Sequence, residues 1–234
     1  MESIHEGFIK AFYLIIALDP ELLNILFMSL RVSGSALIIA AILGIIVGAI
    51  TALRTFRFRD SLISVLHACM GLPSVLVGLL LYLILSRSGP LGFLALLYTP
   101  SAMIIAQVVL AFPIIASLSH SAIAAVDPLI RQTARTLGAT PLQETAAVVH
   151  EARFGIFSAA IAGFGRAISE VGAVLLVGGN IAGFTRVMTT TIALETDKGN
   201  FELAMAIGIV LLAVSLTINI ALYRIQRRTA VGKV

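Results

Sequence analysis

The sequence predicts an all-α membrane protein with five transmembrane helices and an amino-terminal interfacial helix. Hydrophobic residues make up 59% of the 234 residues and charged residues only 12%, whereas soluble domains carry about 25% charged residues. The mean hydropathy is +1.05. Apolar runs long enough to cross a bilayer, which takes roughly 20 residues, recur between short polar stretches. These observations exclude a soluble globular domain and predict a multi-pass protein of the plasma membrane.

Residues 1–20 predict an amphipathic helix that lies in the membrane interface. Ile4, Phe8 and Phe12 share one helical face, and Glu6 lies on the other. An apolar face opposite a charged face is typical of interfacial helices. A cleaved signal peptide fits less well, because acidic residues occupy the segment that is basic in signal peptides.

Residues 21–234 predict one transmembrane domain. Gly34, Gly44 and Gly48 in the first span are expected to let a neighbouring helix approach closely. Pro73 and Pro113 predict kinks in the second and third spans, because proline removes a backbone donor. The five spans are expected at about Leu22–Leu53, Leu62–Leu85, Ala102–Ala125, Phe154–Val177 and Phe201–Tyr223.

The basic residues predict the orientation of the chain. Lys and Arg concentrate on the cytoplasmic side of membrane proteins. If the polar stretch 127–153 is cytoplasmic, that side holds ten of the sixteen basic residues, and five spans place the amino terminus outside and the carboxyl terminus inside. The same bias accounts for the net charge of +4 without a nucleic-acid partner.

The polar stretch 127–153 predicts two short helices joined by a tight turn. Pro128 can open the first helix, and Gly138 can end it with a positive φ. A second helix can begin near Thr140 or Pro141, where proline needs no amide donor. Two short helices joined in this way would fit a groove in a partner protein. The same spacing of proline and glycine also occurs in ordinary cytoplasmic loops.

Two segments resemble ABC importer permeases. Residues 132–138 resemble the EAA loop of that family: Ala134 and Gly138 match, whereas Gln132 and Thr133 replace the first two residues of the motif. The stretch Gly163–Thr196 closely resembles the permease subunit of tungstate-type ABC importers, and the similarity covers essentially the whole chain. Molybdate and sulfate permeases of the same superfamily resemble it less closely.

The resemblance implies a type I (MetI-like) importer fold and a set of partners. It implies a homodimer of this chain, two ATP-binding subunits that use ATP and Mg, and an extracytoplasmic oxyanion-binding protein, all assembled in membrane lipid. No cofactor is expected on this chain itself. The residues expected to contact the ATP-binding subunit are Arg131, Gln132, Ala134, Arg135, Leu137, Gly138, Ala139, Thr140 and Pro141.

Charged and polar residues in the fourth span and after it are candidates for a translocation path. Arg166 and Glu170 are four residues apart and therefore share one helical face. An isolated charge in a membrane is costly, so the two are expected to pair. The pair could hold helices together or take part directly in the path. The further candidates, whose hydroxyl and amide groups could meet an oxyanion or could instead bond to their own helix, are Ser169, Asn180, Thr189, Thr190 and Thr191.

Other functions have weaker support. The sequence contains no catalytic constellation, no glycine-rich lysine loop and no metal-ligand spacing. An intramembrane enzyme would have to use Glu170 and His150 as acid and base, and a proton-coupled transporter would use Glu170. Physical reasoning does not separate tungstate from molybdate or sulfate, since all are tetrahedral oxyanions. The resemblance selects tungstate.

Overall fold

The computed structural model describes residues 9, 13, 16, 17 and 19–231, and within them it contains helices and no strand. The predicted interfacial helix over residues 1–20 falls largely outside the described residues. The longer helices are α2 (Pro20–Leu53), α5 (Pro100–Ala124), α8 (Arg153–Ile168) and α11 (Phe201–Val231). The shorter ones are α3 (Arg59–Cys69), α4 (Ser74–Leu85), η1 (Gly92–Leu94), α6 (Pro128–Thr136), α7 (Pro141–Glu151), α9 (Gly172–Gly178) and α10 (Met188–Asp197).

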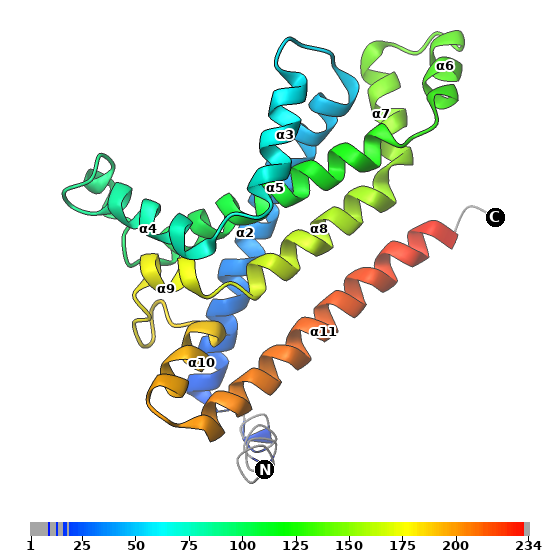
Figure 1. The fold of residues 1–234 in the computed structure, drawn as a ribbon. Coiled ribbons are helices and arrows are strands. Elements are labelled where there is room, and N and C mark those ends of the chain that lie inside the picture. The colour runs from blue at the N-terminus through cyan, green and yellow to red at the C-terminus, as the bar shows by residue number, and fades with distance from the viewer. Residues whose placement is uncertain (1–8, 10–12, 14–15, 18, 232–234) are drawn as a thin grey trace.

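The long helices α2, α5 and α8 pack against one another and form the centre of the molecule (Figure 1). The helix α2 runs from the end that holds α10 to the end that holds α3, α6 and α7. At one side α4 packs on α9, and α11 packs on α10 and α8. Side chains on the outer surface of α2 and α11 are mostly apolar and exposed, which is expected of helices that face lipid or another chain.

Close packing of α2 on α5 depends on small residues. A Cβ atom added at Gly44 would lie 2.9 Å from a side-chain carbon of Ile115, and one added at Gly48 would lie 2.8 Å from the carbonyl oxygen of Ala116. The predicted close approach is therefore confirmed at Gly44 and Gly48. At Gly34 it is wrong, because a Cβ there would meet nothing within 4 Å.

The second predicted span is broken rather than gently kinked. The helices α3 and α4 meet at an angle of 104° around the segment Gly71–Pro73. Proline lacks an amide donor and disfavours helical geometry in the residue before it, so the break lies where the sequence predicts a kink. The angle exceeds what a kinked straight span would show.

The fourth predicted span, Phe154–Val177, is also not one helix. The helix α8 ends at Ile168, residues 169–171 are non-helical, and α9 begins at Gly172. At its other end α8 meets α7 at an angle of 64°. In the described residues, three helices are long and apolar enough to cross a membrane, or up to five if each bent pair, α3 with α4 and α7 with α8, is one span.

We expect Gly48→Ala to destabilise the protein by about 1–3 kcal/mol, the usual cost of overpacking, because the new methyl group meets the α5 backbone. Gly34→Ala is the matched control: it adds the same methyl group to the same helix in open space, and should be neutral or slightly stabilising, since alanine favours helix. Thermal unfolding of both variants in detergent measures the difference. Equal midpoints for the two variants would contradict the packing described here.

Candidate functional site

The polar stretch forms a hairpin of two short helices, α6 and α7. The Asp127 carboxylate accepts a hydrogen bond from the Leu129 amide at 2.8 Å and caps the start of α6. The helix ends at Thr136. Gly138 follows in the turn with a φ of +79°, and the Ala139 amide donates to the Ala134 carbonyl at 3.0 Å. A positive φ is easily adopted only by glycine. The predicted turn at Gly138 is confirmed.

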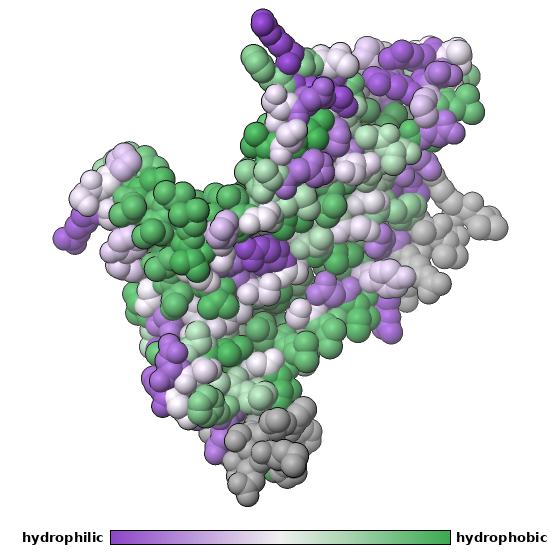
Figure 2. All heavy atoms as spheres, in the orientation of Figure 1, coloured by the Kyte–Doolittle hydropathy of each residue, from purple (hydrophilic) through white to green (hydrophobic). Residues whose placement is uncertain are grey.

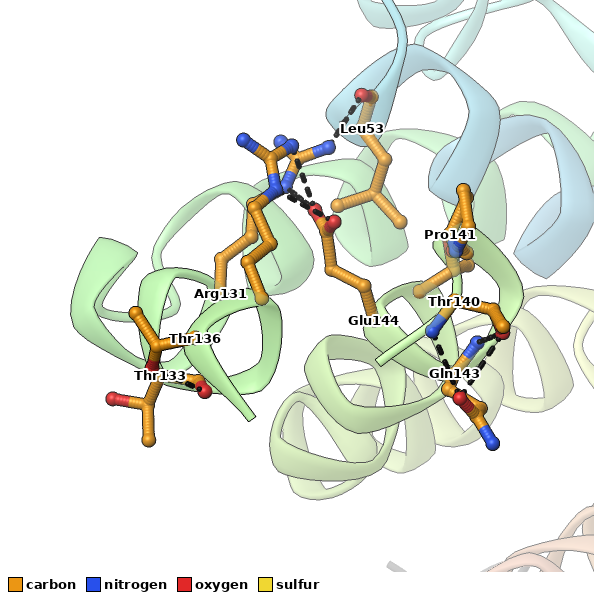
Figure 3. A network of polar contacts seen from close by, with 10 residues as sticks. Leu53, Arg131, Thr133, Thr136, Thr140, Pro141, Gln143 and Glu144 are labelled. Carbon is orange, nitrogen blue, oxygen red and sulfur yellow. Dashed lines mark hydrogen bonds and ion pairs between the residues drawn. The ribbon is translucent and has the colours of Figure 1, made fainter. Parts of the chain in front are cut away.

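The start of α7 is held by a reciprocal cap (Figure 3). The Thr140 amide donates to Gln143 Oε1 at 2.8 Å, and the Gln143 amide donates to Thr140 Oγ1 at 3.4 Å. Pro141 occupies the first turn, where no amide donor is required. The predicted start of a second helix at Thr140 and Pro141 is therefore confirmed.

A buried carboxylate joins the two helices. Glu144 of α7 is only 6% exposed. Arg135 of α6 donates from Nε to Glu144 Oε2 at 2.8 Å and from Nη2 to Oε1 at 3.1 Å, while Arg131 Nε also donates to Oε1. Arg131 further reaches the Leu53 carbonyl at the end of α2, at 3.4 Å (Figure 3). The carboxylate thus fixes α6 against α7, and Arg131 ties both to α2.

These bonds stabilise the charged form of Glu144. Hydrogen bonds from Arg135 and Arg131 lower the pKa of Glu144 from its ordinary value of 4.5 to about 2. A lowered pKa means that the stabilisation is complete above 4.5 and is lost as the pH falls toward 2. The hairpin therefore keeps this connection throughout the neutral range.

Three leucines on the hairpin have no apolar cover. Leu129, Leu137 and Leu142 are 62%, 82% and 79% exposed. Figure 2 shows that hydrophilic side chains otherwise gather at this end of the molecule. Large apolar side chains exposed within a polar surface can supply a protein contact site. Of the other predicted contact residues, Gln132, Arg135, Gly138, Thr140 and Pro141 are exposed, and Arg131, Ala134 and Ala139 are partly buried.

The pairing of Glu144 is a feature that sequence reasoning missed. Arg131 and Arg135 are four apart and so share one face of α6. A turn as short as the one at Gly138 brings the first turn of α7 close to that face. Glu144, the acidic residue in the first turn of α7, was the signal in the sequence that could have predicted these ion pairs.

A second polar group lies at the break between α8 and α9. Glu170 is 2% exposed, and its carboxylate accepts from Arg166 Nη1 at 2.7 Å and from the Ala173 amide at 3.0 Å. The predicted pairing of Arg166 with Glu170 is confirmed. The Glu170 carbonyl accepts from Thr189 Oγ1 of α10 at 2.8 Å, so three helices meet at this residue.

Gln107 of α5 contacts the same break, which sequence reasoning did not anticipate. Its Nε2 donates to the Ala167 carbonyl at 3.0 Å, and the side chain is buried. Ala167 lies in the last turn of α8, where carbonyl groups lose their helical partners. A buried glutamine in an apolar helix was the signal for such a contact.

The remaining path candidates bond within the chain. Ser169 Oγ donates to the Gly165 carbonyl at 2.7 Å, and Thr191 Oγ1 donates to the Val187 carbonyl at 2.7 Å. Thr190 Oγ1 lies 2.9 Å from Asn180 Oδ1. A hydroxyl has one proton to donate, so an oxyanion would have to displace these bonds. The structure joins Arg166, Glu170 and Thr189 in one group and Asn180 and Thr190 in another.

The described residues contain no group of three or more His, Cys, Asp or Glu side chains that could hold a metal ion. Among those residues, His150 lies on α7, whereas Glu170 lies in the non-helical break between α8 and α9. The partners of Glu170 are Arg166 and the Ala173 amide. Its hydrogen bonds are those of a structural carboxylate.

We expect Glu170→Ala and Arg166→Ala each to destabilise the protein, and the double variant to lose less than the sum of the two. Removal of one partner leaves a charge in an apolar setting, whereas removal of both does not. The coupling energy should be about 1 kcal/mol or more, measured by denaturation in detergent. Strictly additive losses would show that the pair does not contribute to stability.

The chain is similar in sequence to proteins of known families. Residues 22–231 match the family model "Binding-protein-dependent transport system inner membrane component". The chain is 44% identical over 226 residues to the tungstate uptake system permease protein TupB of Peptoclostridium acidaminophilum, covering 97% of this chain and 99% of that protein. It is 45% identical over 213 residues to a probable anion ABC transporter permease protein of Haloferax volcanii, covering 89% and 92%.

Solved structures show the same fold. A bacterial alginate ABC transporter, in complex with an alginate pentasaccharide-bound periplasmic protein, includes a chain that matches with a TM-score of 0.77 at 19% identity, covering 98% of this chain and 88% of that one. The family model covers residues 22–231, nearly the whole of the helical fold described here. The chain belongs to the family of binding-protein-dependent transport system inner membrane components.

Proposed function

We propose that this chain is the permease subunit of an ATP-driven importer that carries tungstate across the plasma membrane. The observation that carries the proposal is the 44% identity to a tungstate uptake permease over 97% of the chain. The chain is a transport component and not an enzyme, as are its relatives. ATP hydrolysis, with its Mg, belongs to a separate subunit.

The α6–α7 hairpin docks on that ATP-binding subunit. Its support is geometric: the hairpin is held by Glu144 and presents Leu129, Leu137 and Leu142 to solvent. A rigid hairpin can pass a movement of the ATP-binding subunit on to the membrane helices. The exposed leucines supply apolar area for the contact with that subunit. The docking residues comprise Arg131, Gln132, Ala134, Arg135, Leu137, Gly138, Ala139, Thr140 and Pro141.

The chain crosses the membrane five times, with its amino terminus outside and its carboxyl terminus in the cytoplasm. This count takes α3 with α4 as the second span and α8 with α9 as the fourth, and leaves α7 outside the membrane. The orientation is supported by the basic residues. The basic connection from α2 to α3, with Arg54 and Arg57, lies at the same end of the molecule as α6, which carries Arg131 and Arg135 (Figure 1). Basic loops favour the cytoplasm.

The working assembly contains a second copy of this chain, two ATP-binding subunits and an extracytoplasmic oxyanion-binding protein. Only 28% of the most apolar stretch of α2 and 22% of that of α11 are buried within one chain, so the outer surfaces of both helices are available for lipid and for the second copy. A related transporter was solved with its substrate-bound periplasmic protein, which is consistent with a binding protein that delivers the ion.

Arg166, Ser169 and Glu170 border the translocation path at the α8–α9 break, together with Asn180 and Thr189–Thr191 on the adjoining segments. The role of these residues is to hold the break in shape. Their donors bond within the chain, so the ion meets a polar wall without a fixed cage. Weak contacts suit a path, because an ion that binds tightly is not released.

We expect ATP-dependent tungstate uptake by liposomes that contain the permease, its ATP-binding subunit and its binding protein. Molybdate should be carried less well and sulfate barely, when the ions compete at matched concentrations. Omission of the ATP-binding subunit is the control and should abolish uptake. Sulfate, phosphate or an organic solute carried as efficiently as tungstate would contradict the substrate assignment and leave the coupling assignment standing.

A further inference from the structure

Two adjoining cavities lie between the end of α2 and the start of α7. One has a volume of about 440 Å³ and includes Ala49, Ile50 and Leu142 in its lining. The second has a volume of about 350 Å³. Leu53 and Pro141 are among the residues that line both. The two cavities therefore form one continuous groove, called here the α2–α7 groove.

The second cavity of the groove is strongly basic. Arg54, Arg131 and Arg135 line it, and Glu144 is the one acidic residue among the lining residues. Three guanidinium groups against one carboxylate leave an excess of two positive charges. Both oxygens of Glu144 already accept bonds from Arg131 and Arg135. The charge excess is therefore available to an anion.

Arg54 provides the free cation of this cavity. It is the first residue after α2, and its backbone amide donates to the Ile50 carbonyl at 3.0 Å. Its side chain is exposed and has no ion pair among the described residues. A guanidinium fork matches the geometry of a phosphate group. Arg54 can thus bind a phosphate without the loss of an existing bond.

The first cavity of the groove is suited to hydrocarbon. Ile50 is 47% exposed. It lies in the last turn of the 34-residue apolar helix α2, just before a basic turn begins. This change from apolar to basic residues marks a membrane boundary. An acyl chain can therefore lie against Ile50 while its head group lies against Arg54.

We propose that the α2–α7 groove binds an anionic phospholipid, with the phosphate on Arg54 and an acyl chain along Ile50. Arg131 and Arg135 stay paired with Glu144 and add to the positive charge around the phosphate. A free phosphate would use only the basic half of the groove, and a neutral lipid would leave the two excess charges unpaired. The lipid would then cover the joint between α2 and the hairpin. The proposal rests on the proposed orientation, which places this end at the cytoplasmic leaflet.

Binding of phosphatidylglycerol to the purified full-length chain in neutral detergent tests the proposal by native mass spectrometry. We expect wild type to bind phosphatidylglycerol in preference to phosphatidylcholine. Arg54→Gln should weaken phosphatidylglycerol binding about five- to tenfold, in keeping with the loss of one phosphate contact. Arg54→Lys should restore most of it. Because binding is read without transport, this test is independent of the tungstate assignment.

Arg57→Gln is the matched control. Arg57 lies in the same basic turn, is exposed and does not line the groove, so its variant should bind like wild type. Equal losses for Arg54→Gln and Arg57→Gln would overturn the proposal in favour of diffuse charge attraction. Equal binding of phosphatidylcholine would overturn it, and so would glycerol phosphate that competes as well as the whole lipid, since that result removes the acyl chain from the site.

Discussion

A backbone surrounded by hydrocarbon has no water to bond, so each amide and carbonyl must find its partner within the protein. This requirement explains why the described chain is helical, and it is most demanding at the break between α8 and α9. There the Ala167 carbonyl receives Gln107, the Glu170 carbonyl receives Thr189, and the Glu170 carboxylate accepts the Ala173 amide. The polar side chains of this region are thus the partners that a break in a membrane helix requires.

The opposite problem arises at the hairpin, which we propose lies outside the membrane. Its helices have 9 and 11 residues, too short to be stable alone in water. End caps and the Glu144 ion pairs hold the two helices to each other, and Val148 of α7 packs in an apolar cluster with Ile123 and Ile156. Leu129, Leu137 and Leu142 lie outside that cluster and remain on the surface. The hairpin is thus held in place and still presents apolar side chains to a partner.

The hairpin is also connected to the end of α2, beside the α2–α7 groove. Arg131 contacts Glu144 and the Leu53 carbonyl, so the end of α2 and the hairpin share one charged joint. A displacement of the hairpin by a bound ATP-binding subunit would therefore reach α2 directly. A lipid in the α2–α7 groove would lie on that connection.

Local rules of the chain predicted much of this architecture. Gly138, Thr140 and Pro141 act on the few residues next to them in the chain, so the turn and the helix start could be located from sequence. The break after α8 could not, because hydropathy over Phe154–Val177 is continuous and the partners of the break lie far away in sequence, at Gln107 and Thr189.

The glycines of α2 likewise differ in ways that the local sequence does not reveal. Gly44 and Gly48 face α5 and Gly34 faces open space, and only tertiary packing distinguishes them. The ion pairs of Glu144 likewise join residues on separate helices. Sequence therefore predicts elements and turns more fully than it predicts which faces meet.

The measurement that tests this account most directly is the affinity of the permease for its ATP-binding subunit after Glu144→Gln. The variant keeps the size of the side chain but not its charge, which frees α6 from α7. The account predicts at least a tenfold loss of affinity and a matching loss of stimulated ATP hydrolysis. Glu151→Gln, an exposed neighbour on α7, should have no effect. Wild-type affinity in a folded Glu144→Gln permease would contradict the account.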